Sequence, residues 1–257
     1  MKISLISVVY NNASGLRNSL FSSFQQKYSN VERIVIDGAS NDGTLDVMNE
    51  FQSSLEHIIS EPDLGIYDAL NKGVSLATGD VIGNLHSDDL SPDSDVLSRV
   101  AEVFVKTDVE FLYGDLCYVS SINPKQIVRH WKANEYSPNS LVKGWMPPHP
   151  TVYVRRELFE RFGDYNLRYK ISSDYDWLLR LLGDESLRVA YLPHVLVLMR
   201  TGGASNRSLS NLWKKSWEDW DIIRHHQIGG IKTLFFKNIS KIPQFLSHRK
   251  NFQSMFL

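Results

Sequence analysis

Two adjacent carboxylates, Asp88 and Asp89, are the side chains of this chain best suited to holding a divalent cation. They follow the apolar run at 80–85, which is predicted to be a buried strand. Neighbouring carboxylates at a strand end repel each other and are costly to desolvate, so a compensating cation is favoured. A divalent metal that carries a phosphate meets this need. The alternative is a solvated turn before a helix that starts near 91–93.

Asp37 is a second carboxylate at the end of an apolar run, 31–37, and it enters the glycine-rich loop 38–43. A carboxylate in this position can accept a hydrogen bond from a ring N–H of a nucleotide base. The alternative is an Asx-turn, which the sequence Asp-Gly favours strongly. Asn11 follows the first apolar run in the same way.

The elements that must position these residues alternate along the first half of the chain. Strands are predicted at 3–10, 31–37, 55–60 and 80–85, with helical spacing of apolar residues at 16–24, 44–51 and 66–77. This alternation predicts an α/β fold with a doubly wound, mostly parallel sheet. Ligands of such sheets bind beyond the carboxyl ends of the strands, where Asn11, Asp37 and the Asp88-Asp89 pair fall.

The second half is less regular and shows no internal repeat. Helices are predicted at 93–105, 155–162, 174–182 and 208–226, and strands at 109–119, 126–130, 188–191 and 195–200. We therefore expect one domain over 1–226, with a nucleotide-binding half at 1–90 and an acceptor-side half at 91–226.

Composition excludes several classes of protein. The 257 residues are 42% hydrophobic with a net charge of −1, so no basic field indicates a nucleic-acid partner. The single cysteine, Cys117, excludes an internal disulfide framework and fits a reducing compartment. Neither a signal-peptide pattern nor an apolar run of membrane-spanning length is found, and a cytoplasmic protein is expected. The glycine motifs of dinucleotide oxidoreductases and P-loop NTPases are also missing, so carboxylates, a metal and loops would have to bind a nucleotide.

Five segments in order resemble the family 2 glycosyltransferases, which have the GT-A fold. They are ISVVYNN, VIDGASNDGT, EPDLGIYDALNKG, ATGD and LHSDD, at 6–12, 35–44, 61–73, 77–80 and 85–89. The resemblance is greatest to enzymes that build bacterial capsule, exopolysaccharide or lipopolysaccharide. It implies an inverting glycosyltransferase that uses a nucleotide-diphospho-sugar with Mg²⁺ or Mn²⁺.

The resemblance also assigns roles to residues of the donor side. Asp37 matches the aspartate that contacts the donor base, and Tyr10 and Asn11 match the segment that lines the base and ribose. Lys72 follows on a predicted helix and is a candidate for the diphosphate, with a solvated helix lysine as the alternative.

The Asp88-Asp89 pair matches the DXD-type element of the family. Asp89 is the expected metal ligand, and Asp88 is expected to contact the ribose or support the metal. The family often has Asn-Ser or Asn-Ala where this chain has His86-Ser87, so the role of His86 stays open.

Sugar transfer also needs a base for the acceptor hydroxyl, opposite the leaving diphosphate. The segment at 171–180 resembles the family's Glu-Asp-x-Asp helix start, with Ser173 in place of the glutamate. Asp174 is thus the expected base, Asp176 is the second candidate, and an N-cap is the alternative role of Asp174.

Two further residues are candidate contacts to the acceptor or the diphosphate. Trp177 is interpreted either as an aromatic wall for the acceptor sugar or as a core residue. His149 lies in a proline-rich loop, 147–150, where an ordinary loop hydrogen bond is the alternative. The turn at 200–205 has the glycines of a flexible lid.

The end of the chain is basic. No acidic residue follows Asp221, and lysines and arginines interleave with Ile, Leu and Phe over 227–257. This pattern predicts a basic amphipathic segment on an anionic membrane surface. The alternative is a helix docked through its apolar side, with its lysines in water.

Together these features favour a metal-dependent inverting glycosyltransferase that moves a sugar from a nucleotide diphosphate, UDP rather than GDP, to a lipid-linked saccharide or oligosaccharide. A nucleotidyltransferase is the enzymatic alternative, although residues 11–15 lack its glycine-rich basic loop. A non-catalytic sugar-nucleotide-binding protein is the third interpretation.

Overall fold

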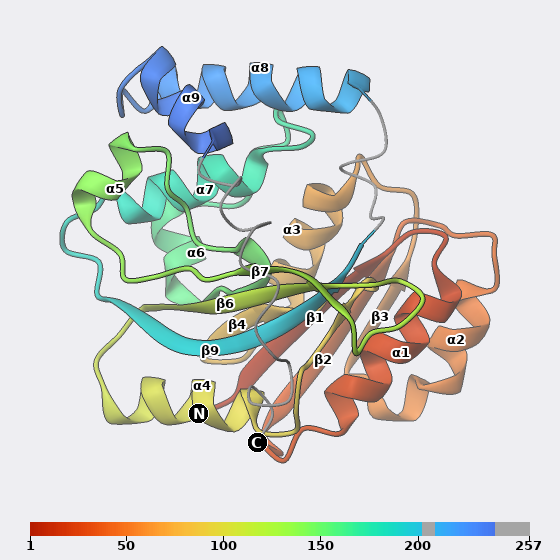
Figure 1. Cartoon of the computed structure of the whole chain (residues 1–257). Coiled ribbons are helices and arrows are strands. Elements are labelled where there is room, and N and C mark those ends of the chain that lie inside the picture. Colours follow the sequence, from red (N-terminus) through yellow and green to blue (C-terminus); the bar gives the residue numbers. More distant parts are fainter. Residues whose placement is uncertain (202–208, 240–257) are drawn as a thin grey trace.

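In the computed structural model, which describes residues 1–201 and 209–239, a mixed sheet runs through the molecule with helices on both faces (Figure 1). The strand order is β3-β2-β1-β4-β8-β6-β9-β5, and β7 pairs with β6 beside this path. The strands are β1 (Ile3–Val9), β2 (Val31–Asp37), β3 (His57–Ser60), β4 (Val81–Asn84), β5 (Asp89–Leu90), β6 (Phe111–Val119), β7 (Ile127–Trp131), β8 (Tyr153–Arg155) and β9 (Val189–Arg200).

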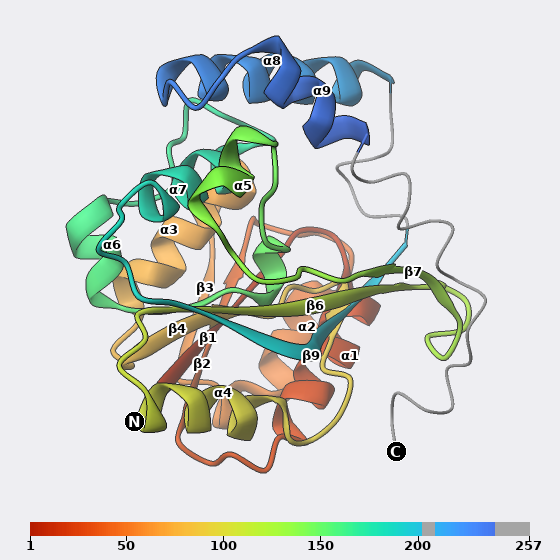
Figure 2. The ribbon, with the colours of Figure 1, turned by 60° about the vertical axis from the view of Figure 1, so that its left-hand side comes forward.

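The helices fall into two groups by the face that they cover, with α1, α2 and α4 on one side and α3, α6 and α7 on the other (Figures 1 and 2). Their bounds are α1 (Ala13–Phe24), α2 (Thr44–Glu50), α3 (Ile66–Leu76), α4 (Val96–Lys106), α5 (Pro138–Val142), α6 (Glu157–Phe162), α7 (Ser173–Leu182), α8 (Leu209–His225) and α9 (Ile231–Ile239), with short 3₁₀ turns η1 (Gln52–Ser54) and η2 (His149–Thr151).

The first four strands are parallel to one another, as the alternating pattern predicts. Every residue of β1 is buried, because helices cover both of its faces and leave no polar side. Ile6 and Ile34 pack toward α3, whereas Val9 and Val35 pack toward α1 and α2. The parallel half of the α/β fold is thus confirmed, and it brings the ends of β1, β2 and β4 to one edge.

The second half of the sheet is mixed. Strand β8 lies between β4 and β6 and runs antiparallel to both, while β9 is parallel to β6. The two strands predicted at 188–191 and 195–200 are one strand, β9, whose register shifts where Asp115 pairs with Val195. Pro193 explains the break in the pattern, because it has no N–H to donate and the strand bulges past it.

Two short strands were not predicted. β8 occupies the start of the segment expected to be helical from 155, and α6 begins only at Glu157. β5 consists of Asp89 and Leu90, which pair with Met199 and Leu198 of β9. Asp89 therefore begins a short strand with a buried side chain, whereas Asp88 lies in the turn before it and is half-buried.

Helices α8 and α9 lie beyond α7, away from the sheet (Figures 1 and 2). The side chain of Lys237 on α9 is only 2% exposed; its Nζ lies 2.8 Å from Asp219 of α8 and 3.0 Å from the ring centre of Tyr175. The docked-helix alternative placed the lysines of this segment in water, and the buried Lys237 differs from that expectation. The predicted lid at 202–205 and residues 240–257 of that segment lie outside the described residues.

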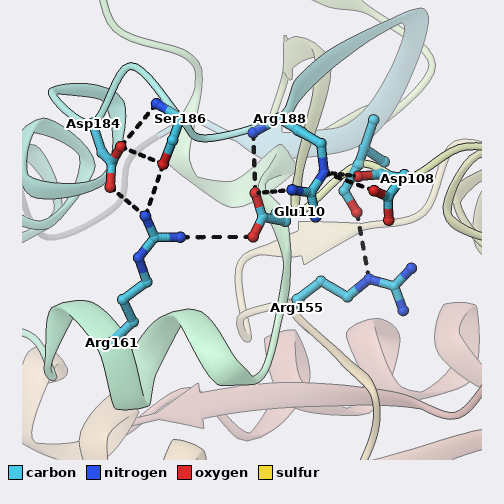
Figure 3. A network of polar contacts seen from close by, with 8 residues as sticks. Asp108, Glu110, Arg155, Arg161, Asp184, Ser186 and Arg188 are labelled. Atoms are coloured by element: carbon cyan, nitrogen blue, oxygen red, sulfur yellow. Dashed lines mark hydrogen bonds and ion pairs between the residues drawn. The ribbon is translucent and has the colours of Figure 1, made fainter.

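A polar network fastens the opposite edge of the sheet, where β6 and β9 begin (Figure 3). The buried carboxylate of Glu110 accepts the backbone N–H of Arg188 at 3.1 Å and forms ion pairs with the guanidinium groups of Arg188 and Arg161. Arg161 also pairs with Asp184. The network joins α6 to the starts of two strands, far from the edge at which β1, β2 and β4 end.

Candidate active site

The loops after β1 and β2 are tied to each other at the carboxyl edge of the sheet. The backbone N–H of Asn11 donates to Ser40 Oγ at 2.7 Å, and the N–H of Asn41 donates to Asn11 Oδ1 at 2.9 Å. Asn11 and Ala39 have φ of 48° and 61°, a left-handed conformation that costs energy in residues other than glycine. Hydrogen bonds across the two loops hold them in this shape.

Asp37 lies at the base of these loops with no exposed surface. Its carboxylate accepts from Ser40 N at 2.9 Å, from Ser60 Oγ at 2.7 Å and from the hydroxyl of Ser40. The carboxylate thus stabilises the loop that follows it through an N–H three residues on, and not the one two residues on that an Asx-turn would use. The carboxylate is fully buried and already has three donors, so the predicted contact to a donor base stays a prediction.

Tyr10 forms the entrance to this region and is 66% exposed. Gly38 lies beneath it, and a Cβ at Gly38 would come within 2.5 Å of Asp63 Oδ2 and 3.3 Å of Tyr10 Cδ2. Any other residue at this position would displace Asp63. Asp63 was not singled out from the sequence, although the Glu-Pro-Asp turn after β3 is a signal that places it at this edge.

Asp88 and Asp89 have very different surroundings. Asp88 accepts a hydrogen bond from Asn12 Nδ2 at 2.8 Å, and its backbone carbonyl accepts the N–H of Arg200 at 3.1 Å. Asp89 is 1% exposed, and neither of its carboxylate oxygens is hydrogen-bonded within the described part of the chain. Burial and the neighbouring charge of Asp88 raise the pKa of Asp89 to about 8. A buried carboxylate without hydrogen bonds is stabilised by a cation.

The residues at this edge fit a divalent metal that is shared with a diphosphate. No group of three or more His, Cys, Asp or Glu side chains within 1–201 and 209–239 is arranged to hold a metal alone. Mg²⁺ is commonly bound by one or two carboxylates together with substrate phosphates and water, and Asp88 and Asp89 supply that number. Nδ1 of His86 is buried and finds no partner in the described chain. Burial, together with the nearby His149, lowers the pKa of His86 to about 3, so its imidazole is neutral.

Asp174 lies in the first turn of α7, where the helix dipole stabilises a carboxylate. The hydroxyl of Tyr67 on α3 lies 3.0 Å from Asp174 Oδ1 and 2.8 Å from the carbonyl oxygen of Ile171. The Tyr67 hydroxyl, from a helix distant in the sequence, therefore contacts the candidate base.

Asp176, the second candidate for the base, is 3% exposed and already paired. His226 Nε2 lies 2.9 Å from Asp176 Oδ1, and Arg180 Nε lies 3.2 Å from Oδ2. This carboxylate joins α7 to the end of α8. Asp176 therefore has a structural role, which differs from the expectation that it could act as the base.

Trp177 and His149 are both buried. Trp177 is 1% exposed, its ring stacks on Phe159 at 4.7 Å, and its Nε1–H donates to the carbonyl of Gly163 at 3.1 Å. Its side chain fills the core and cannot form the wall of a sugar site. His149 Nε2 lies 2.8 Å from the hydroxyl of Tyr165, and burial lowers the pKa of His149. The loop hydrogen bond that was the alternative for His149 is therefore present.

Two tyrosines interact with residues of the candidate site. Tyr165 reaches both His149 and Asn84, at the end of β4. Tyr118 of β6 pairs with Met199 of β9, which in turn pairs with Asp89, so Tyr118 and Asp89 share one face of the sheet. Burial raises the pKa of Tyr118, Arg129 opposes the shift, and Asp89 and Asp174 add to it. Tyr118 thus lies within electrostatic reach of both carboxylates.

Lys72 is held away from the carboxylate pair. Its Nζ lies 2.8 Å from Glu61 and 3.6 Å from Asp68, and it donates to the carbonyl of Pro62 at 3.1 Å. Two carboxylates already balance its charge. The arrangement favours the helix-lysine alternative over the predicted contact to the diphosphate.

An aspartate pair thus follows the parallel half of the sheet, and a third aspartate lies in the first turn of α7, the pattern expected of a transferase that uses a sugar nucleotide. Residues 4–169 match the model of glycosyl transferase family 2, and the chain belongs to this family. It is therefore a glycosyltransferase, and its fold is of the GT-A type.

The relatives agree with this assignment. A PGL/p-HBAD biosynthesis glycosyltransferase of Mycobacterium bovis is 34% identical over 209 residues, which cover 79% of this chain and 78% of that protein. S. aureus TarS 1-349 in complex with UDP-GlcNAc superposes with a TM-score of 0.71 at 17% identity, over 96% of this chain and 72% of that one. The mannosyltransferase PcManGT of Pyrobaculum calidifontis, in complex with GDP-Man and Mn²⁺, has a TM-score of 0.65 at 17% identity, over 96% and 73% of the two chains.

Proposed function

We propose that this glycosyltransferase is metal-dependent and inverting, and that it transfers a sugar from a UDP-sugar to a lipid-linked or oligosaccharide acceptor in bacterial surface polysaccharide synthesis. The observation that carries the proposal is the Asp89 carboxylate, which is buried and without hydrogen bonds in the described chain, beside Asp88. This pair lies at the edge of the sheet that also holds Asp37.

The donor side is formed by the tied loops after β1 and β2. Tyr10 is exposed for stacking on a base, and Asn11 and Asp37 fix the loops beneath it. Complexes of TarS with UDP and UDP-GlcNAc support a uridine donor. The complex of PcManGT with GDP-Man keeps a guanosine donor as the alternative.

Asp88 and Asp89 are the residues that would hold Mg²⁺ or Mn²⁺, and the bound ion would neutralise charge on the departing diphosphate. Asp174 takes the proton of the acceptor hydroxyl as that oxygen attacks the sugar, a role typically worth ~10²–10⁴-fold in rate. An inverting transfer needs one such base and no enzyme nucleophile. We assign this role to Asp174 because Asp176, the other carboxylate at the start of α7, already forms ion pairs with Arg180 and His226.

A membrane-bound acceptor is supported by the outer surface of α8 and α9. Four aromatic side chains there are at least half exposed: Trp213 at 79%, Trp217 at 64%, Phe235 at 59% and Phe236 at 50%. Among the described residues no helix has both the length and the apolar character to cross a bilayer. We infer that α8 and α9 lie on an anionic membrane surface, and we propose that this surface is the cytoplasmic face of the membrane.

Two variants test the assignment of roles, with melting temperature and transfer as separate readouts. For Asp89→Asn, we expect the stabilisation by UDP and Mn²⁺, about 2.7 kcal/mol at 100 times the Kd in the unmodified enzyme, to lose its metal-dependent part. For Asp174→Asn, we expect that stabilisation to persist while kcat falls by ~10²-fold or more.

Asp95→Asn serves as the control, because Asp95 pairs with Lys27 on the surface and should leave both readouts unchanged. Near-normal transfer by Asp89→Asn at ordinary metal concentrations would contradict the metal site. Release of pyrophosphate would indicate a nucleotidyltransferase, and donor binding without transfer to any acceptor would indicate a binding protein.

A further inference from the structure

A carboxylate on α8, far along the chain, is directed at the loop that carries the candidate base. Glu218 is 5% exposed. Its Oε1 accepts the backbone N–H of Lys170 at 3.0 Å, and its Oε2 accepts those of Ile171 and Ser172 at 2.8 and 2.9 Å. Three successive N–H groups form a concave site for an anion, and hydrogen bonds to a charged acceptor are about twice as strong as neutral ones.

The same loop is held from its other side by α3. The Tyr67 hydroxyl contacts the carbonyl oxygen of Ile171 at 2.8 Å, so Glu218 binds the N–H of Ile171 and Tyr67 binds its C=O. Two residues before Ile171, the hydroxyl of Tyr169 donates to Asp221 of α8 at 2.8 Å. Residues 169–172 are thus fixed between two helices, and α7 begins directly after them with Asp174 in its first turn.

We propose that Glu218 is a positioning residue for sugar transfer, which sets the place of Asp174 through the backbone of 170–172. The inference rests on the proposed role of Asp174 as the base. Glu218 touches neither substrate nor the reacting atoms; it acts by fixing where the first turn of α7 begins. A displacement of about 1 Å at a reacting group costs on the order of 10²-fold in rate, so the loop has to be held firmly.

The comparison of Glu218→Gln with Glu218→Ala separates positioning from packing. Glutamine fills the same volume, but its amide accepts through one oxygen and turns an NH₂ toward the N–H of Lys170 or Ile171. We expect kcat to fall ~10-fold for Glu218→Gln and ~100-fold for Glu218→Ala, with the Kd for UDP and Mn²⁺ within about 2-fold of the unmodified enzyme. The donor residues lie on other elements, which is why binding should be spared.

A matched control is Asp219→Asn, the next residue on α8. Asp219 is equally buried but pairs with Lys215 and Lys237 and does not touch the loop. We expect this variant to lower the melting temperature and to leave kcat with a soluble acceptor within about 2-fold. Hydrogen–deuterium exchange gives a readout independent of activity: the amides of 170–172 should lose protection in Glu218→Gln and keep it in Asp219→Asn.

The outcomes distinguish this inference from the proposed function. If Asp174→Asn abolishes transfer while Glu218→Gln keeps full kcat and full amide protection, the positioning role of Glu218 is wrong. The assignment of Asp174 as the base is then unaffected. If Asp174→Asn leaves transfer intact, the role of Asp174 is wrong, and the inference falls with it. A parallel loss of kcat and donor affinity in Glu218→Gln would indicate general disruption and would overturn the proposal.

Discussion

The side chain of Asn12 joins the first helix to the carboxylate pair. Its Oδ1 caps α1 by accepting the N–H of Gly15 at 3.1 Å, and its Nδ2 donates to Asp88 Oδ1 at 2.8 Å. A Cβ at Gly15 would come within 2.3 Å of Asn12 Nδ2, so glycine is required for this approach. The Oδ1 atom of Asn12 thus stabilises the helix, and its Nδ2 atom orients Asp88.

The two functions of Asn12 can be separated by substitution. Serine is also a good N-cap but is too short to replace the amide at Asp88. We expect Asn12→Ala to lower the free energy of unfolding by about 1 kcal/mol and Asn12→Ser by a few tenths, measured by urea unfolding. Both variants should weaken the binding of UDP with Mn²⁺ by roughly 5-fold, the effect of about 1 kcal/mol for one hydrogen bond. Full affinity in Asn12→Ser would show that the contact to Asp88 is dispensable.

At the scale of elements, β1 and β2 are joined at their amino ends by a second buried carboxylate. Glu32 is 2% exposed and lies in register with Ser4. Its carboxylate accepts hydrogen bonds from Lys2 Nζ at 2.6 Å, from Thr78 N at 2.8 Å and from the hydroxyl of Ser4. Burial alone would raise the pKa of Glu32, but these hydrogen bonds outweigh it and lower the pKa to about 2.

This shift predicts a pH dependence of stability. Because the folded pKa lies below the ordinary value of 4.5, the contribution of Glu32 is complete above that value and is lost as pH falls toward 2. We expect Glu32→Gln to cost about 1–3 kcal/mol at pH 7, and the difference from the unmodified protein to shrink between pH 5 and pH 2. Unfolding in urea at several pH values measures it. A difference that stays constant with pH would contradict the role of the charge.

At the scale of the whole molecule, the aromatic surface of α8 and α9 predicts binding to membranes. The acidic residues of α8 already have partners within the protein. Glu218 accepts hydrogen bonds from the loop 170–172, Asp219 forms ion pairs with Lys215 and Lys237, and Asp221 interacts with Tyr169 and Arg168. These carboxylates therefore do not neutralise the exposed cations Lys214, Arg224 and Lys232, which can interact with anionic lipid headgroups. Basic groups near an anionic bilayer contribute about 1 kcal/mol each.

We expect the protein to sediment with vesicles that contain phosphatidylglycerol, less with vesicles of phosphatidylcholine alone, and less again at high salt. The double variant Trp213→Ser/Trp217→Ser should weaken binding with little change in melting temperature, because both rings are solvent-exposed. Ile122→Ser is the matched control, since Ile122 is 94% exposed on the β6–β7 hairpin. Equal binding to both kinds of vesicle would argue against an electrostatic component.

Local pattern was enough to predict the parallel half of the sheet and the residues at its carboxyl edge. Strand and helix periods are properties of neighbouring residues, and parallel strands must end at one edge, so the positions of Asn11, Asp37 and Asp88 could be placed without coordinates. The family motifs in the first 90 residues added the chemistry. The same reasoning did not find β8 or β5, which are short and are formed only by pairing with distant strands.

The tertiary structure decided which of the predicted side chains are still open to a ligand. Asp89, Asp174 and Asp176 are the same residue type but have different partners. Asp89 has no hydrogen bond in the described chain, and Asp174 is hydrogen-bonded to Tyr67. Asp176 forms ion pairs with His226 and Arg180. These partners come from segments 107 residues away for Tyr67 and 50 for His226. Local periodicity reports the face on which a residue lies, whereas the groups that face it depend on how distant segments pack, and packing sets whether a carboxylate serves the fold or the reaction.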